Sequence, residues 1–148
     1  MFANTYPKLS EVDLDAVEQR LGVALPDDLR DIYLQFNGGR PLRNVFRSAS
    51  EEYDIQQFLA MKYADDNSSF EGTYEDLAKG NQFFPKGMIP FAVDDAGDYF
   101  LYSTRPESFG SIWFNQSDYI NDPNRFLVRL AESLNAFLSA LREAERKE

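Results

Sequence analysis

Carboxylates are the side chains of this sequence that best suit catalysis or metal binding. The 148 residues contain no histidine and no cysteine, so a Ser-His-Asp triad, a thiolate nucleophile and a Cys/His zinc site are excluded. A glycine-rich phosphate loop ending in Lys-Ser or Lys-Thr is also missing from the sequence. The chemistry that remains is a pair of facing acids or an oxygen-only site for Mg²⁺ or Ca²⁺.

A short acidic run in the second half of the sequence is the first candidate for such chemistry. It contains Asp94, Asp95 and Asp98, and Glu71, Glu75 and Asp76 come earlier in the chain. The run does not match a calcium-binding loop, because Ala96 and Gly97 follow the first two acids and no glutamate closes the loop. A hairpin turn explains the same residues. We therefore predict no catalytic residue, no metal and no cofactor, and a carboxylate-dependent enzyme or divalent-metal binder is the alternative.

The overall charge favours a protein partner over a nucleic acid. The chain has a formal net charge of -10 and a sequence pI of about 4.5, whereas nucleic-acid binding depends on clustered Lys and Arg. We expect a basic partner. The alternative is that the surplus carboxylates only keep the protein soluble.

Nine residues are predicted to contact that partner. The densest acidic stretch runs from Glu51 to Glu71. It is either a solvated loop or a face that steers a basic protein, such as a nuclease, into contact. Trp113 is included because Ile112 and Phe114 would share one face of a strand, which leaves Trp113 exposed or partly exposed on the other face. The predicted set is Glu51, Glu52, Asp54, Asp65, Asp66, Glu71, Asp94, Asp95 and Trp113.

Two helices are predicted near the N-terminus. Ser10 followed by Asp13 is typical of a helix start, and Gly22 would end that first helix. Pro26 with the two acids after it begins a second helix, whose apolar residues recur at helical spacing. The segment 37–39, Asn-Gly-Gly, is interpreted as the cap of this second helix, and an anion-binding nest is the alternative.

The middle of the chain has the alternation and turn residues of β-strands. A short strand is predicted at 45–46, a longer one over 53–61, and strands at 88–93, 98–103 and 111–115, with a tight turn at 94–97. A brief helix is predicted at 73–78. Apolar residues at three- and four-residue spacing predict one long helix from about 123 to 141, packed on the sheet. Segment 142–148 is a charged, frayed tail.

These elements predict one α+β domain over residues 1–148, with two N-terminal helices, a central antiparallel meander sheet and a long C-terminal helix. The N-terminal segment lacks the pattern of a secretory signal, and no apolar stretch approaches the ~20 residues that span a bilayer. We therefore expect a cytoplasmic protein without membrane contact. The oligomeric state stays open.

Several of these segments resemble the SUKH superfamily, which groups bacterial toxin-immunity proteins with fungal regulators of cell-wall synthesis. The resemblance begins in segment 21–29, Leu-Gly-Val-Ala-Leu-Pro-Asp-Asp-Leu, and continues into Phe-Asn-Gly-Gly at 36–39. Ile-Pro-Phe-Ala at 89–92, followed by Asp95, Gly97 and Asp98, is similar to the superfamily's central hairpin. The terminal segment through Leu134, Phe137 and Leu138 is similar to its closing helix.

The resemblance implies an α+β fold without a catalytic centre or cofactor. It implies a protein that binds and neutralises a cognate toxin, and a scaffold or regulatory module is the alternative. Because the contact surface differs between members of such families, the resemblance assigns no contact residue.

Overall fold

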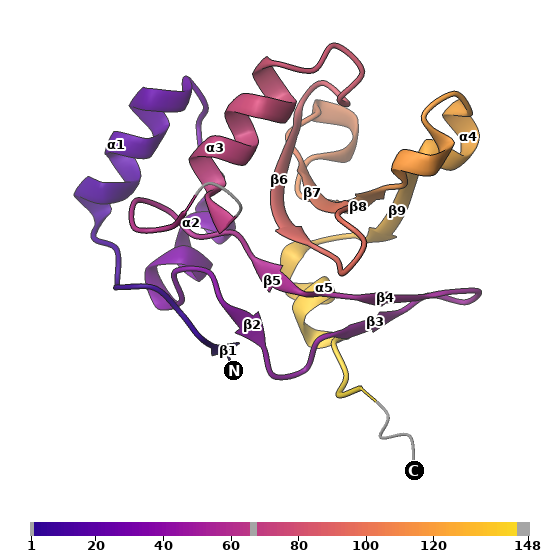
Figure 1. Cartoon of the computed structure of the whole chain (residues 1–148), viewed down its shortest axis with the longest axis horizontal. Helices are drawn as coiled ribbons and strands as arrows, with labels where there is room; N and C mark the ends of the chain where they lie inside the picture. The colour runs from indigo at the N-terminus through magenta and orange to yellow at the C-terminus, as the bar shows by residue number, and fades with distance from the viewer. Residues whose placement is uncertain (1, 66–67, 145–148) are drawn as a thin grey trace.

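The computed structural model describes residues 2–65 and 68–144 and shows an α+β protein with a five-stranded antiparallel sheet at its centre (Figure 1). The sheet has the order β5-β6-β7-β8-β9, so each strand pairs with its neighbours in the sequence. The strands are β5 (Gln57–Phe58), β6 (Met88–Val93), β7 (Tyr99–Ser103), β8 (Ile112–Asn115) and β9 (Leu127–Ala131). The predicted antiparallel meander is confirmed.

Both N-terminal helices begin where the local sequence signals predict, and the first also ends where they predict. Helix α1 (Glu11–Leu21) starts with a capping box, because the Ser10 hydroxyl accepts from the Asp13 backbone and the Asp13 carboxylate accepts from the Ser10 backbone. Gly22 ends α1 with a left-handed φ of 67°. Helix α2 (Asp27–Gln35) follows directly, with two acids in its first turn.

Arg30 holds these two helices together. Its guanidinium lies 2.5 Å from carboxylate oxygens of Glu11 and Glu18 and 3.2 Å from Asp15, and its side chain is only 15% exposed. The second oxygen of Glu18 accepts a hydrogen bond from the Leu25 backbone at 2.7 Å. One cation of α2 is therefore shared among three carboxylates of α1.

Replacing Arg30 with methionine, which keeps most of the apolar stem, is expected to lower the free energy of unfolding by about 1–2 kcal/mol. The variant would leave three neighbouring carboxylates that repel one another. Urea unfolding at low and at high salt measures the effect, and screening should shrink the difference from wild type. An equal difference at both salt concentrations would contradict the electrostatic explanation.

The Asn-Gly-Gly segment packs against a neighbouring chain segment and is not the helix cap that the sequence suggests. Helix α2 is instead capped by Phe36 in an extended conformation. Gly38 has φ of 70°, and a Cβ at this position would lie 2.6 Å from the Cβ of Ala60. The backbone N–H groups of Gly38 and Gly39 donate to Phe36 and Phe58 carbonyls. These donors are therefore not free to form an anion-binding nest.

The helix predicted at 73–78 is longer and less regular than expected. It starts earlier, as α3 (Phe70–Tyr74), because the Ser69 hydroxyl caps it by accepting from the Gly72 backbone at 3.0 Å. It then widens into a π-helical turn, η2 (Glu75–Lys79), which ends at Gly80 near the predicted stop.

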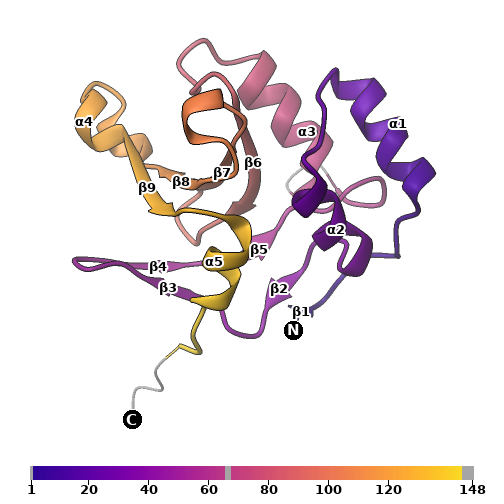
Figure 2. The same cartoon turned by 180° about the vertical axis from the view of Figure 1, so that it is seen from behind.

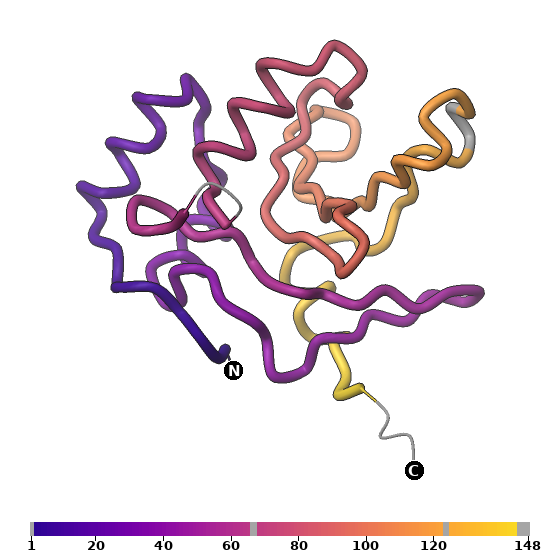
Figure 3. The backbone as a smooth tube through the Cα atoms, in the orientation of Figure 1, coloured from indigo at the N-terminus to yellow at the C-terminus, as the bar shows by residue number. Residues whose placement is uncertain are grey.

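The strand predicted over 53–61 is divided between two sheets. Strand β4 (Glu52–Asp54) forms a hairpin with β3 (Val45–Arg47), whereas β5 pairs with β6. Between them, the Ile55 backbone N–H donates to the Asn44 carbonyl, which turns the chain from one ladder to the other. Figure 3 shows the β3–β4 hairpin reaching out from the body of the molecule. A further small ladder joins β1 (Phe2–Ala3) to β2 (Arg40–Pro41).

The prediction of one long C-terminal helix is wrong. The segment forms a short helix α4 (Pro123–Phe126), then strand β9, then helix α5 (Leu134–Ser139), which starts where the Ser133 hydroxyl accepts from the Ala136 backbone at 3.0 Å. Pairing with β8 satisfies the backbone groups of 127–131 in the sheet and makes β9 its last strand. Short 3₁₀ turns at Pro106–Ser108 and Ser117–Tyr119 complete the elements.

The main core lies between the sheet, the N-terminal helices, α5 and the β3–β4 hairpin (Figure 2). Phe137 of α5 stands at its centre with no exposed surface. Its ring contacts those of Phe46, Phe91 and Phe100, with centroids 5.2, 6.1 and 5.7 Å away. The C-terminal helix therefore does pack on the sheet, although it is shorter than predicted.

Candidate partner-binding surface

The second face of the five-stranded sheet carries its own small apolar cluster. Met88 and Leu101 point away from the main core and pack with Phe84 from the loop after η2. Trp113 is half-buried at the border of this cluster, and its indole N–H donates to the Ser111 hydroxyl at 2.7 Å. The prediction that Trp113 is partly exposed and faces away from Ile112 and Phe114 is therefore confirmed.

A cleft of about 180 Å³ lies on this second face, and we call it the sheet-end cleft. Two of its apolar side chains are strongly exposed, since Phe83 is 64% and Ile120 is 45% accessible to solvent. Large apolar side chains exposed side by side mark contact surfaces more often than chance. The lining residues are Leu77, Asn81, Phe83, Phe84, Gly97, Asp98, Tyr99, Asn115, Ser117, Ile120 and Phe126.

The turn between β6 and β7 forms one wall of the sheet-end cleft. The Asp94 carboxylate accepts from the backbone N–H groups of Ala96 at 3.0 Å and Asp98 at 2.8 Å. Gly97 has φ of 93°, which a left-handed turn position requires. The hairpin interpretation is confirmed, and one oxygen of Asp94 belongs to the turn itself.

Burial raises the pKa of Asp94 above its usual value, and hydrogen bonds from the Asp98 and Ala96 backbones oppose that rise. Asp95, at the tip of the turn, is exposed to solvent. Of the two predicted acids in this turn, Asp95 is therefore the one whose carboxylate is free to meet a partner.

Two carboxylates act on a tyrosine that lines the cleft. Burial raises the pKa of the Tyr99 phenol, and the negative charges of Asp76 and Asp98 raise that pKa further. Asp98 lines the cleft together with Tyr99, whereas Asp76 lies outside the lining. Asp98 also accepts a hydrogen bond from the Ser117 backbone at 3.3 Å, which ties the β6–β7 turn to the segment that carries Ile120.

The predicted acids of the β3–β4 hairpin are exposed. They are Glu51, Glu52 and Asp54, and Glu52 forms an ion pair with Arg47 at 2.7 Å. The Gln56 backbone N–H donates to the Val93 carbonyl at 2.9 Å, so the chain that leaves this hairpin runs beside the end of β6, just before Asp94. The structure therefore places the hairpin acids and the turn acids on neighbouring elements.

The other predicted acids lie elsewhere. Asp65 is exposed in the loop before α3, and Asp66 falls outside the described residues. Glu71 is buried, only 6% exposed, and one of its oxygens accepts from the Lys62 backbone at 2.8 Å. The expectation that Glu71 contributes to an exposed acidic stretch is wrong, because its position in the first turn of α3 directs the carboxylate toward the 61–62 backbone.

Sequence reasoning missed the apolar residues of the sheet-end cleft. Phe83 and Ile120 lie in loops outside the predicted helices and strands, and only the fold brings them to one cleft. Among residues 2–65 and 68–144, no group of three or more Asp or Glu residues is arranged to hold a metal ion. In that same part of the chain, no helix combines the length and apolarity needed to cross a membrane.

Comparison with protein families connects this geometry to a known group. Residues 8–140 match the model of the SMI1 / KNR4 family (SUKH-1). The match covers both N-terminal helices, the whole five-stranded sheet and α5. No curated protein and no solved structure matches the chain.

Proposed function

The chain belongs to the SMI1 / KNR4 family (SUKH-1), and on that premise we propose that it is a non-catalytic protein-binding domain that neutralises a cognate toxin by direct contact. Family membership is compatible with either an immunity or a regulatory domain. The observation that supports protein binding is the sheet-end cleft, which exposed Phe83 and Ile120 line together with Asp98. An apolar anchor site with a charged rim is the usual anatomy of a protein interface.

The charges around the cleft favour a basic partner. Asp76 and Asp98 act on the Tyr99 ring, Asp95 is exposed at the turn, and the hairpin acids extend the negative surface on a neighbouring element. Such a surface speeds the approach of a positively charged protein, and the apolar cleft would then receive one of its side chains. A nuclease toxin has the required charge, because its own site must hold phosphates.

The toxin role is tested by expressing this chain with the product of the neighbouring reading frame. We expect the neighbouring product alone to stop growth, and growth to return when both proteins are present. The purified proteins should form a stable complex whose association rate falls as salt rises. A neighbouring frame that encodes no toxin would contradict the immunity role and favour the regulatory one.

The role of the cleft is tested with the double variant Phe83→Ala/Asp95→Lys. Both side chains are exposed, so the variant should fold normally, and we expect the dissociation constant to rise about tenfold or more. Glu132→Lys is the control. This exposed residue follows Ala131, which pairs with Ile112, whereas the cleft residue Asn115 pairs with Leu127 at the other end of β9. Equal loss of binding in both variants, or none in either, would overturn the assignment of the cleft.

A further inference from the structure

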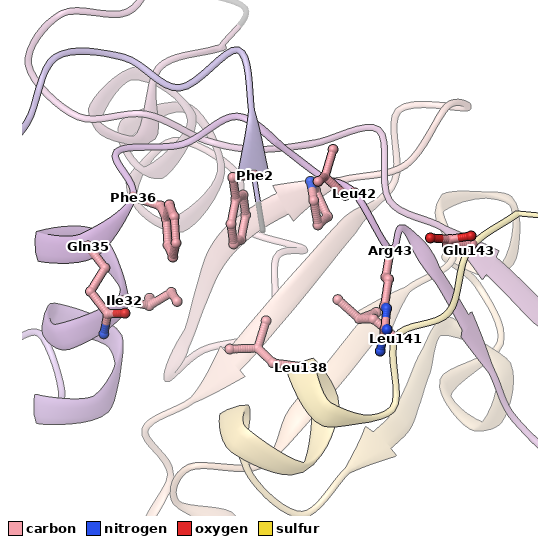
Figure 4. Close-up of a pocket in the computed structure, with 10 residues that line it drawn as sticks. Phe2, Ile32, Gln35, Phe36, Leu42, Arg43, Leu138, Leu141 and Glu143 are labelled. Carbon is pink, nitrogen blue, oxygen red and sulfur yellow. The ribbon is translucent and has the colours of Figure 1, made fainter.

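A second hollow, unrelated to the sheet-end cleft, lies between α2, the β1–β2 ladder and α5. Its volume is about 600 Å³, and its walls are mainly the apolar side chains of Phe2, Ile32, Phe36, Leu42, Leu138 and Leu141 (Figure 4). We call it the arginine-edged groove. It has no lining residue in common with the sheet-end cleft.

The apolar walls are held in place by aromatic contacts with the body of the protein. The Phe2 ring stacks on Phe36, with centroids 4.7 Å apart and planes at 27°, and meets Phe58 edge-on at 5.0 Å. Helix α2 buries its Leu29 and Tyr33 in the core, which leaves Ile32 half-buried on the groove side. Leu42 is 60% exposed at the rim. The groove is therefore preformed and open to solvent.

Three arginines gather where the groove meets an adjoining hollow, although the whole chain carries a net charge of -10. Arg43 lines the groove, and together with Arg47 and Arg142 it also lines an adjoining hollow of about 490 Å³. Arg47 forms an ion pair with Glu52, whereas neither Arg43 nor Arg142 has an ion-pair partner among the described residues. Figure 4 shows the Arg43 side chain extending past Leu141 and away from Glu143, the carboxylate on this part of the rim.

From this combination we propose that the arginine-edged groove binds an acidic segment of a partner protein, with apolar side chains seated between α2 and α5 and flanking carboxylates paired to Arg43 and Arg142. The apolar groove would hold the apolar side chains of the segment. Arg43 and Arg142, which have no ion-pair partner among the described residues, would favour negative charges beside them. The sheet-end cleft, by contrast, favours a basic partner. The two surfaces can therefore serve different partners, and this proposal stands whether or not the chain neutralises a toxin.

The test uses three synthetic peptides and the complete chain with isotope-labelled methyl groups. The first peptide has two leucines flanked by glutamates, the second replaces the glutamates with lysines, and the third replaces the leucines with serines. We expect the first peptide alone, at up to about 1 mM, to shift the methyl signals of Ile32, Leu42 and Leu138. Equal shifts with the lysine peptide, shifts confined to the sheet-end cleft, or no shifts with any peptide would overturn the proposal.

Two variants with exposed side chains separate the charged from the apolar contribution. Arg43→Glu is expected to weaken binding of the glutamate peptide about tenfold and to remove most of its salt dependence. Leu42→Ser should weaken binding while keeping the salt dependence. Lys79→Glu is the charge-matched control, because this exposed residue ends η2 and does not line the groove. Loss of binding in the control to the same degree as in Arg43→Glu would show that only the net charge matters, and would overturn the proposed pairing.

Discussion

Replacing Phe137 with alanine is expected to lower the free energy of unfolding by about 3–5 kcal/mol. The side chain has no exposed surface, and its ring joins three parts of the fold, namely β3 through Phe46, β6 through Phe91 and β7 through Phe100. The cavity left behind cannot collapse easily, because each of these rings is held by further contacts. A domain of this size is stabilised by only about 5–15 kcal/mol, so the variant would lose a large part of its stability.

Chemical unfolding of the purified variant measures this effect. Phe109→Ala is the matched control, because Phe109 is 60% exposed and should change the free energy of unfolding by less than about 1 kcal/mol. If both variants lost the same small amount, Phe137 would not be the centre of the core that the structure describes. Such a result would also remove the support for α5 as an element packed on the sheet.

Replacing Asn37 with alanine is expected to cost about 2–4 kcal/mol, although the residue is polar and stands outside every helix and strand. Asn37 is only 2% exposed. Its amide group donates to the carbonyls of Pro7 and Met61, both at 2.9 Å, and its oxygen accepts from the Met61 backbone at 2.8 Å. The substitution would leave these backbone groups without partners in a place that water does not reach easily.

Two further variants isolate the hydrogen bonds of Asn37 from the simple loss of a side chain. Asn37→Asp keeps the acceptor for the Met61 N–H but loses both donated bonds, so we expect it to be destabilised as well. Asn135→Ala, at an exposed position of α5, should leave the melting temperature nearly unchanged. A stable Asn37→Ala protein would mean that this network does not hold the N-terminal segment to the 60–62 backbone.

The contrast between the two ends of the chain shows what local signals can predict. The start of α1 depends on Ser10 and Asp13, three residues apart, and its end depends on Gly22. Such capping interactions are complete within a few residues, so they can be read without knowing the rest of the fold. The β6–β7 turn is local in the same sense, since Asp94 and Gly97 build it between themselves.

The prediction for the C-terminal segment failed because its structure depends on a distant part of the chain. The apolar residues of 126–141 fit helical spacing, but Leu127, Val128 and Leu130 fit a half-buried strand as well. The segment is a strand because β8 offers it a free edge, with Asn115 opposite Leu127 and Ile112 opposite Ala131. Periodicity cannot distinguish the two structures when the deciding hydrogen bonds come from another part of the chain.

By itself the sequence determined which chemistry is excluded, because the absence of histidine and cysteine does not depend on folding. It also determined the two caps of α1, the central hairpin and the surplus of carboxylates. Only the tertiary structure decided which carboxylates meet solvent, since Asp95 is exposed whereas Glu71 is turned into the interior. It alone brought Phe83 and Ile120 to one cleft, and Phe2 and Leu138 to one groove, because residues apart in the chain line one hollow only through the packing of the whole domain.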